Sequence, residues 1–367
     1  MPLYIHQRKN WPDFVWNDNK LACVLGEVRY EQGKISGRMD SLGFSEKTET
    51  VLHTITQDIT KSNEIEGEVL NTDQVRSSVA RRLGLDVAGL VPSDRHVDGV
   101  VEMTLDAIQN YNQELTKDRL LGWQASLFPS GRSGMYQIIT GNWRDNEKGP
   151  MQVVSGPIGK ETVHFEAPEA ARLDQEMDQF LLWFNSDIDI DPVLKSAIAH
   201  FWFVTIHPFD DGNGRIARTI ADMQLARAEA NSQRFYSMSA QIRQRRNEYY
   251  TVLEKTQKGT LDITDWLEWF LSCLKDALNV TNETLNSILQ RVAFWDKNAT
   301  VPLNERQRLL VTKMQEGFFG KLTTSKWAKI AKCSQDTAGR DIQDLIEKGI
   351  LKKDGAGGRS TAYELIW

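Results

Sequence analysis

Residues 207–218 read HPFDDGNGRIAR and join two stretches that both have the pattern of helices. The preceding residues 191–206 (DPVLKSAIAHFWFVTI) are apolar on nearly all sides, which predicts a buried central helix. Ile216 and Ile220 stand four positions apart in the following stretch, so a second helix is expected to begin near Asn213. The sequence therefore places a short polar turn between two helices at the centre of the fold.

Two glycines and two arginines give this turn the pattern of an anion-binding site. Gly212 and Gly214 leave the backbone uncrowded, so that amide groups at the helix N-terminus can point at an anion. The side chain of Asn213 can add a further donor. Arg215 and Arg218 stand three positions apart on the helix and can bind further phosphate oxygens.

A carboxylate and a histidine complete the stretch. Asp211 stands beside the glycines and could hold Mg²⁺ against the same phosphates. His207 stands at the end of the preceding helix, where it could act as a general base. Each feature alone is more typical of an ordinary helix connection, a packed histidine or a solvated helix face. Together they favour a nucleoside triphosphate, a metal ion and a base that deprotonates an attacking hydroxyl.

The whole stretch resembles the signature of the Fic family, HxFx(D/E)GNGRxxR, at every defined position. The resemblance implies that ATP donates AMP to a Ser, Thr or Tyr hydroxyl of a target protein, with His207 as the base and Asp211 holding Mg²⁺. Phe209 would anchor the loop in the core. The anion hole and the two arginines that hold the β- and γ-phosphates would be Gly212, Asn213, Gly214, Arg215 and Arg218.

The resemblance extends to two further segments. GPMQVVSGPIGKETVHF has the pattern of a two-strand hairpin, and by resemblance it is the flap that docks an extended stretch of the target. Its docking positions would be Val153, Val154 and Ser155; the alternative is a plain surface hairpin. Tyr249 and Tyr250 match an aromatic pair near the adenine in relatives, although at least one of them is expected to be a core residue.

Residues 60–70, TKSNEIEGEVL, have two interpretations. Asn63 and Glu66 have the spacing of a capping box, which predicts the start of a helix. Ser62, Glu66 and Gly67 also resemble the family's inhibitory motif, (S/T)xxxE(G/N). That resemblance implies that Glu66 pairs with Arg218, which then cannot hold the γ-phosphate.

The last 65 residues have the order helix, helix, helix, hairpin, which is typical of a winged helix-turn-helix domain. Residues 321–359 hold nine Lys or Arg against five Asp or Glu. This local excess favours contact with DNA, although Asp336 and Asp341 weaken that interpretation. A winged helix that binds protein or forms a dimer is an equal alternative. The candidate DNA contacts are Gln335, Thr337, Arg340, Lys352, Lys353 and Arg359.

The chain has 367 residues, a net charge of −6 and three scattered cysteines. No apolar run reaches bilayer length and the cysteines form no CxxC pair, so a cytoplasmic protein without a structural zinc site is expected. The expected fold is mainly α, with a Fic-type helical core, a short β-hairpin flap and a C-terminal winged helix. The expected parts are a helical region at 1–110 with an inhibitory helix at about 60–70, a catalytic core at 111–295 and a winged helix domain at 303–367.

Three functions are compatible with these patterns. The first is an autoinhibited protein adenylyltransferase that uses ATP and Mg²⁺ and also modifies itself. The second is a nucleotide-sensing regulator that binds DNA through the winged helix. The third is a Fic enzyme that uses another nucleotide donor or removes AMP. A homodimer is compatible with all three.

Overall fold

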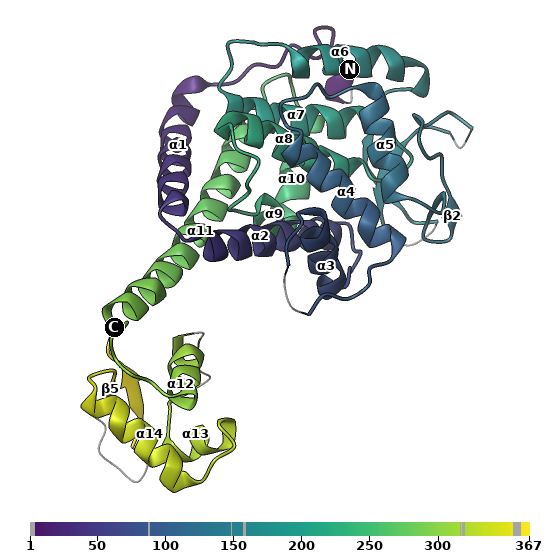
Figure 1. The fold of residues 1–367 in the computed structure, drawn as a ribbon. Helices are drawn as coiled ribbons and strands as arrows, with labels where there is room; N and C mark the ends of the chain where they lie inside the picture. Colours follow the sequence, from purple (N-terminus) through teal and green to yellow (C-terminus); the bar gives the residue numbers. More distant parts are fainter. Residues whose placement is uncertain are drawn as a thin grey trace. The chain divides into compact units, whose positions relative to one another are not determined.

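The computed structural model of the chain describes residues 4–86, 89–147, 149–156, 159–315, 317, 320–354 and 361–367. Its fold is mostly helical, which confirms the expected fold class (Figure 1). The chain divides into two compact units, Met1–Asn282 and Glu283–Trp367. None of the helices in the described residues combines the length and hydropathy that a bilayer span requires.

Five helices form the N-terminal part of the first unit. Most of them begin at a side chain that caps the helix: Asn17, Asn71, Asp94 and Thr116 each accept a hydrogen bond from a backbone amide of the first turn. The helices are α1 (Asp18–Asp40), α2 (Phe44–Ile65), α3 (Thr72–Arg82), α4 (Arg95–Gln109) and α5 (Lys117–Leu127).

The centre of this unit is the helix pair predicted from the sequence. Every side chain of α7 (Pro192–Ile206) from Val193 onward is buried, as its uniformly apolar sequence requires. α8 (Asn213–Glu229) packs along α7 and also contacts α2, α4 and α5. The remaining helices are α6 (Leu173–Asn185), α9 (Met238–Gln244), α10 (Arg246–Gln257) and α11 (Thr264–Lys297), with short 3₁₀ turns at Ile5–Gln7 and Ala170–Arg172.

Two small hairpins complete the first unit. β3 (Gln152–Ser155) pairs antiparallel with β4 (Thr162–Glu166), which confirms the predicted hairpin; Pro157, in its expected turn, lies outside the described residues. β1 (Arg132–Ser133) and β2 (Tyr136–Gln137) form a second hairpin, which was not predicted from the sequence. Its strands have two residues each, too few for an alternating pattern to be visible in the sequence.

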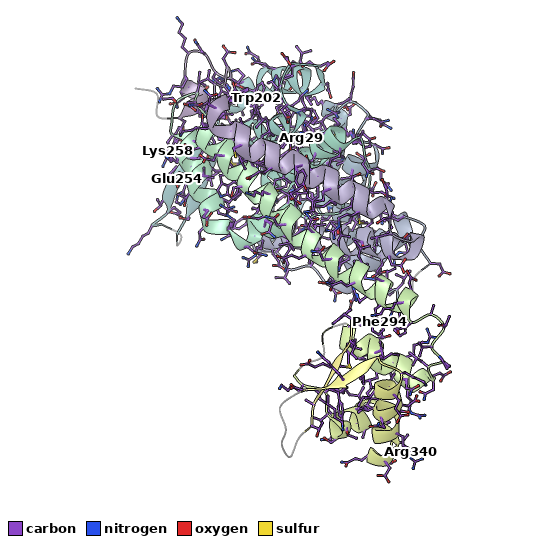
Figure 2. All side chains as sticks on the ribbon, turned by 90° about the vertical axis from the view of Figure 1, so that its left-hand side faces the viewer. Arg29, Trp202, Glu254, Lys258, Phe294 and Arg340 are labelled. Carbon is purple, nitrogen blue, oxygen red and sulfur yellow. The ribbon has the colours of Figure 1, made fainter. Side chains whose placement is uncertain are left out.

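The second unit has the predicted order of elements: α12 (Glu305–Gln315), α13 (Thr324–Ile330), α14 (Gln335–Glu347), and a hairpin of β5 (Leu351–Lys353) and β6 (Tyr363–Leu365). Its core surrounds the fully buried Trp327 and includes Phe294 from the end of α11 (Figure 2). α11 ends at Lys297, two residues past the expected end of the catalytic core at 295. Arg359 lies outside the described residues.

Candidate active site

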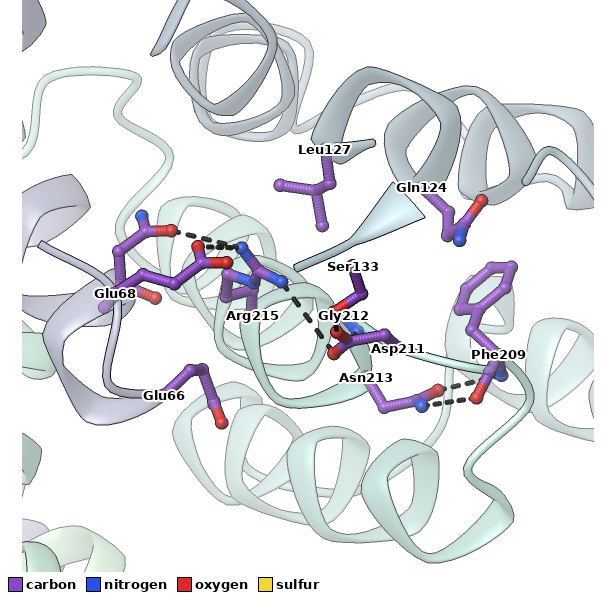
Figure 3. A network of polar contacts seen from close by, with 12 residues as sticks. Glu66, Glu68, Gln124, Leu127, Ser133, Phe209, Asp211, Gly212, Asn213 and Arg215 are labelled. Atoms are coloured by element: carbon purple, nitrogen blue, oxygen red, sulfur yellow. Dashed lines mark hydrogen bonds and ion pairs between the residues drawn. The ribbon is translucent and has the colours of Figure 1, made fainter. Parts of the chain in front are cut away.

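The turn between α7 and α8 is held by its own side chains. His207 ends α7 in a left-handed conformation with φ 53°, which reverses the chain direction. The ring of Phe209 is fully buried and packs on Trp143, with ring centroids 5.0 Å apart. The backbone amide of Phe209 donates to Oδ1 of Asn213 at 2.9 Å, and Nδ2 of Asn213 donates to the carbonyl of Phe209 at 2.7 Å (Figure 3).

This reciprocal pair changes the expected role of Asn213. The sequence suggested a side-chain donor for an anion, but both ends of this amide bind the backbone of Phe209 and the side chain is 2% exposed. Asn213 can therefore offer an anion only its backbone N–H. The side chain instead fixes the shape of the loop.

The imidazole of His207 has the protonation state that a general base needs. Its Nδ1 lies 3.1 Å from the carbonyl of Val204, which can only accept, so Nδ1 carries the proton and Nε2 is left as an acceptor. Burial, assisted by the charge of Arg144, lowers the pKa of His207 to about 4 against the opposing effects of the Val204 hydrogen bond, Asp211 and Glu66. The ring is therefore neutral near pH 7.

Arg144 binds the backbone of this loop, a contact that was not predicted from the sequence. Its Nε donates to the carbonyl of His207 at 2.8 Å, and its Nη2 donates to the carbonyl of Pro168 at 2.6 Å. Its backbone amide also donates to the carbonyl of Pro208 at 2.9 Å. Arg144 is 4% exposed. Its hydrogen bonds link the loop to the segment that follows β4.

At the N-terminus of α8, where the sequence predicts an anion, the space beside the two glycines is narrow and is partly filled by Glu66. Gly212 precedes the helix with φ 90°, and a β-carbon there would lie 3.0 Å from the ring of Phe128 and 3.1 Å from Leu127. A β-carbon on Gly214 would overlap the carboxylate of Glu66. Glycine is needed at both positions, because a side chain would close the space above the helix N-terminus.

Asp211 lies at the edge of this space. Its carboxylate accepts hydrogen bonds from the hydroxyl of Ser133 in β1 and from the amide of Gly212 at 2.5 Å, and Oδ1 lies 3.8 Å from Nη2 of Arg215. The side chain is 41% exposed. Ser133 was not expected here, because its hairpin gave no signal in the sequence.

The residues around Asp211 fit a metal that is bound largely by its substrate. No group of three or more His, Cys, Asp or Glu side chains gathers anywhere in the described part of the chain. Mg²⁺ prefers oxygen ligands, keeps several waters and is commonly bound by one or two carboxylates together with phosphate oxygens. A single, partly exposed carboxylate beside a helix N-terminus is compatible with that mode.

Arg218 is bound in the way that the inhibitory motif suggests. Its Nη2 donates to Oε1 of Glu66 at 2.7 Å and to the carbonyl of Ser62 at 2.9 Å, and its Nε donates to the hydroxyl of Ser62 at 2.9 Å. The guanidinium is 3% exposed. Burial alone would lower the pKa of Arg218, but Glu66 together with Tyr249 and Tyr250 outweighs it and the pKa is raised.

A second carboxylate, missed from the sequence, binds Arg215. Nη1 of Arg215 donates to Oε2 of Glu68 at 2.6 Å and to Oδ1 of Asn63 at 3.3 Å. The guanidinium is 2% exposed and lies 5.0 Å from the ring centroid of Phe128. Figure 3 shows it between Glu68 and Asp211.

The chain turn at Gly67 sets the directions of the Glu66 and Glu68 side chains. α2 ends at Ile65 and Glu66 is its C-cap, so the capping-box interpretation of Asn63 and Glu66 as a helix start is wrong. The helix expected at about 60–70 is the last turn of α2 and the chain reversal that follows it. Gly67 has a φ of 88°, and its amide donates to the carbonyl of Glu64. The amide of Glu68 donates to the carbonyl of Asn63, and the two bonds together form a Schellman motif.

The two tyrosines behind the site have different environments. Tyr249 is 1% exposed and its hydroxyl lies 2.9 Å from Nε2 of the fully buried His200, so the structure places it in the core rather than at the surface of a base pocket. Tyr250 is partly exposed; its ring lies under Arg246, whose Nε donates to the carbonyl of Ile65 at 2.7 Å. Only Tyr250 stays available to a nucleotide base.

The expected docking residues lie on β3. Val154 is 47% exposed, Ser155 is exposed and Val153 is half-buried, with a register irregularity between the two valines. The hydroxyl of Ser155 lies 2.6 Å from Nε2 of His164. Nδ1 of His164 lies 2.8 Å from Oε2 of Glu254 in α10, so this contact ties the hairpin to the helical body.

Known protein families match both parts of the first unit. Residues 114–225 match the Fic/DOC family, and residues 4–85 match a family described as Domain of unknown function (DUF4172). The second match covers α1, α2 and α3, and so includes Ser62, Glu66 and Glu68.

Relatives and solved structures agree with this match. The Protein adenylyltransferase Fic of Aedes aegypti is 25% identical over 270 residues, which are 72% of this chain and 48% of that protein. The protein of the same name from Drosophila yakuba is 34% identical over 106 residues, 28% of this chain and 20% of that protein. The chain thus spans half or less of the length of these curated relatives.

Two crystal structures share the fold. A Fic family protein from Desulfovibrio desulfuricans G20 superposes with a TM-score of 0.51 at 23% identity, covering 94% of this chain and 96% of that one. A Fic domain containing signaling protein from Bacteroides thetaiotaomicron VPI-5482 superposes with a TM-score of 0.52 at 20% identity, covering 71% and 97%. At these identities the likeness concerns the fold alone. It is the family match over residues 114–225 that shows a Fic/DOC domain in this chain.

Proposed function

We propose that this protein is an adenylyltransferase that moves AMP from ATP to a Ser, Thr or Tyr hydroxyl of a target protein. The observation that carries the proposal is the free Nε2 of His207, whose loop leads directly into the N-terminus of α8 and its two buried arginines. A base and an anion site this close match the chemistry of nucleotide transfer to a hydroxyl. The curated relatives that carry the name adenylyltransferase support the same activity.

In the proposed reaction, Nε2 of His207 takes the proton from the target hydroxyl. The hydroxyl oxygen attacks the α-phosphorus of ATP, and the bond from that phosphorus to the bridging oxygen of pyrophosphate breaks. Pyrophosphate leaves with the electron pair of that bond. Arg215, Arg218 and the amides at the start of α8 stabilise the charge that develops on it.

Asp211 would hold Mg²⁺ beside the phosphates, with Ser133 fixing the orientation of the carboxylate. When bound, the ion supplies positive charge that stabilises the departing pyrophosphate. The exposed edge of β3 around Val153, Val154 and Ser155 would align an extended segment of the target by backbone hydrogen bonds. Tyr250 is the aromatic residue that we expect near the base.

We further propose that the protein is autoinhibited by Glu66. A guanidinium that donates to a carboxylate at 2.7 Å and to Ser62 twice has no free fork for the γ-phosphate. ATP must then displace Glu66 or bind with its phosphates out of line. Removal of AMP by the same site, and a donor other than ATP, stay open as variants of this function.

The test is transfer of label from Mg²⁺ and ATP labelled on the α-phosphate. We expect little label on protein with the wild type, strong labelling with Glu66→Gly and none with Glu66→Gly combined with His207→Ala. Label that does not depend on His207 would contradict the role of the base. Parallel reactions with labelled UTP, GTP and CTP identify the donor, and incubation of labelled product without ATP reveals removal of AMP.

One observation favours DNA as a ligand of the C-terminal unit, which we propose to be a winged helix. Asp341, which weakened the DNA interpretation of the sequence, is 4% exposed and accepts from Arg306 at 2.9 and 3.1 Å. Its charge is therefore not presented on α14, where Arg340 is exposed and Thr337 is partly exposed, although Asp336 is exposed there as well. Binding of labelled duplex DNA that weakens with salt and with Arg340→Ala would support this role, whereas salt-independent binding of protein or a homodimer would favour the alternatives.

A further inference from the structure

Both arginines of the anion site are paired with a carboxylate from the same turn. Arg218 binds Glu66, and Arg215 binds Oε2 of Glu68 at 2.6 Å. The guanidiniums are 3% and 2% exposed, and the carboxylate side chains that reach them are 30% and 37% exposed. Each carboxylate therefore enters from the solvent side, which is also the side from which a phosphate would arrive.

The position of Glu68 is fixed by the fold rather than by a mobile side chain. Its backbone amide donates to the carbonyl of Asn63, and that asparagine is fully buried, with Nδ2 donating to Ile59 at 2.9 Å. The same Asn63 accepts from Arg215 at 3.3 Å. The turn that places Glu66 over Arg218 thus places Glu68 over Arg215.

His96, at the start of α4, supports Glu68 from the other side. Its Nδ1 donates to the carbonyl of Leu127 at 3.1 Å, which points Nε2 at Oε2 of Glu68, 3.6 Å away. The polar contact with His96, followed by the charge of Arg215, keeps the pKa of Glu68 below its usual value against the effect of burial. Glu68 is therefore held as an anion between Arg215 and His96.

We propose that Glu68 is a second inhibitory carboxylate, which takes the phosphate position at Arg215 as Glu66 does at Arg218. The inference rests on the proposed function, in which both guanidiniums bind phosphates of the donor. A nucleotide that enters must displace two carboxylates, so removal of Glu66 alone leaves the contact of Glu68 with Arg215 in place. His96 is a positioning residue for this contact.

The alternative is that Glu68 only neutralises a buried arginine. Without Glu68, Arg215 still contacts Asn63 at 3.3 Å and Asp211 at 3.8 Å. If Glu68 is purely structural, its removal would lower the thermal unfolding temperature and would leave the affinity for phosphates unchanged or weaker. If Glu68 is inhibitory, its removal would increase the affinity for phosphates, whether or not the unfolding temperature changes.

The experiment measures binding of Mg²⁺-ATP and of inorganic tripolyphosphate to the full chain by calorimetry. The variants are Glu66→Gln, Glu68→Gln and the double variant, with Glu64→Gln as the control. Glu64 is in the same last turn of α2 but pairs with Lys61 and Arg243, at 2.7 and 3.5 Å, outside the anion site. We expect each site variant to bind either ligand roughly 5- to 150-fold more tightly than the wild type, the double variant more tightly still, and the control like the wild type.

Glu68→Gln that binds no more tightly than the wild type, whether or not its unfolding temperature falls, would overturn the proposal. Tripolyphosphate has no base, so its binding does not depend on which nucleotide is the donor. Transfer of label from ATP is measured on the same proteins. Tighter binding by Glu68→Gln without label in any variant would support the role of Glu68 and contradict adenylyl transfer. Labelling by Glu66→Gln, with no gain in binding from Glu68→Gln, would support adenylyl transfer and contradict the role of Glu68.

Discussion

Glu66 lies so close to Gly214 that a β-carbon at position 214 would overlap its Oε1 atom. The first turn of α8 can receive either a carboxylate of its own chain or a phosphate, and glycine is what makes room for both. The inhibitory contact and the proposed phosphate site therefore share one space. That sharing gives the inhibition a direct steric and electrostatic cause.

Gly214→Ala separates the two uses of this space. In the wild type it should weaken the contact of Glu66 with Arg218 without activating transfer, because the methyl group also obstructs the phosphate. In the Glu66→Gly background the overlap is gone, and we expect Gly214→Ala still to lower transfer by about 100-fold. Label transfer measures both effects, and an unimpaired double variant would mean that the phosphates do not use this position.

Ser62→Ala should release the inhibition in part. The hydroxyl of Ser62 accepts from Nε of Arg218 at 2.9 Å, and a hydrogen bond to a charged group is worth about 1.5–3 kcal/mol. We expect transfer to rise by about tenfold, less than with Glu66→Gly, because Glu66 still binds Nη2. Thr50→Ala, at a partly exposed threonine of α2 outside the anion site, is the matched control. A rise equal to that of Glu66→Gly would mean that the serine, not the carboxylate, dominates.

Substitution of Gly67 tests whether the Schellman turn aims the inhibitory residues. Its φ of 88° is left-handed, which costs a branched residue about 1–2 kcal/mol and an asparagine less. Gly67→Val should distort the turn, displace Glu66 and Glu68 together and raise transfer, whereas Gly67→Asn should behave as the wild type. Label transfer and thermal unfolding of both variants check this, and equal activity of the two would disconnect the turn from the inhibition.

The sequence predicted the part of the site that is local. The apolar helix, the polar turn and the start of α8 depend on neighbours within a few residues, so period and glycine spacing were sufficient. Glu68 and Ser133 were missed because their partners lie 147 and 78 residues away, and no local pattern marks them. Asn213 was misread for a related reason, because its spacing suggests a helix N-terminus but cannot show that its amide is used by Phe209.

Two buried histidines and the partly buried His207 predict a loss of stability in mild acid. Burial lowers the pKa of His6, His200 and His207 from 6.5 to about 4, about 3 and about 4. Between pH 6.5 and about 4 the unfolded chain therefore binds more protons than the folded one, so the free energy of unfolding falls as the pH is lowered through this window.

The unfolding temperature measured from pH 7 to pH 4 checks this direction. His200→Gln should show a shallower fall than the wild type, because it removes the group with the largest shift. His53→Gln, at an exposed histidine of α2, should follow the wild type. A slope that His200→Gln leaves unchanged would assign the acid sensitivity to other groups.

Ser133→Ala tests the link between the β1–β2 hairpin and the proposed metal ligand. The hydroxyl of Ser133 donates to Oδ2 of Asp211 and orients a carboxylate that is otherwise 41% exposed. Loss of such a supporting partner typically weakens metal binding or activity by about 10- to 100-fold. In the Glu66→Gly background we expect the Mg²⁺ concentration for half-maximal transfer to rise by a factor in this range. Ser130→Ala, at an exposed serine of the same loop, should leave it unchanged. A lower maximal rate at an unchanged Mg²⁺ requirement would assign Ser133 to the placement of the loop rather than to the metal.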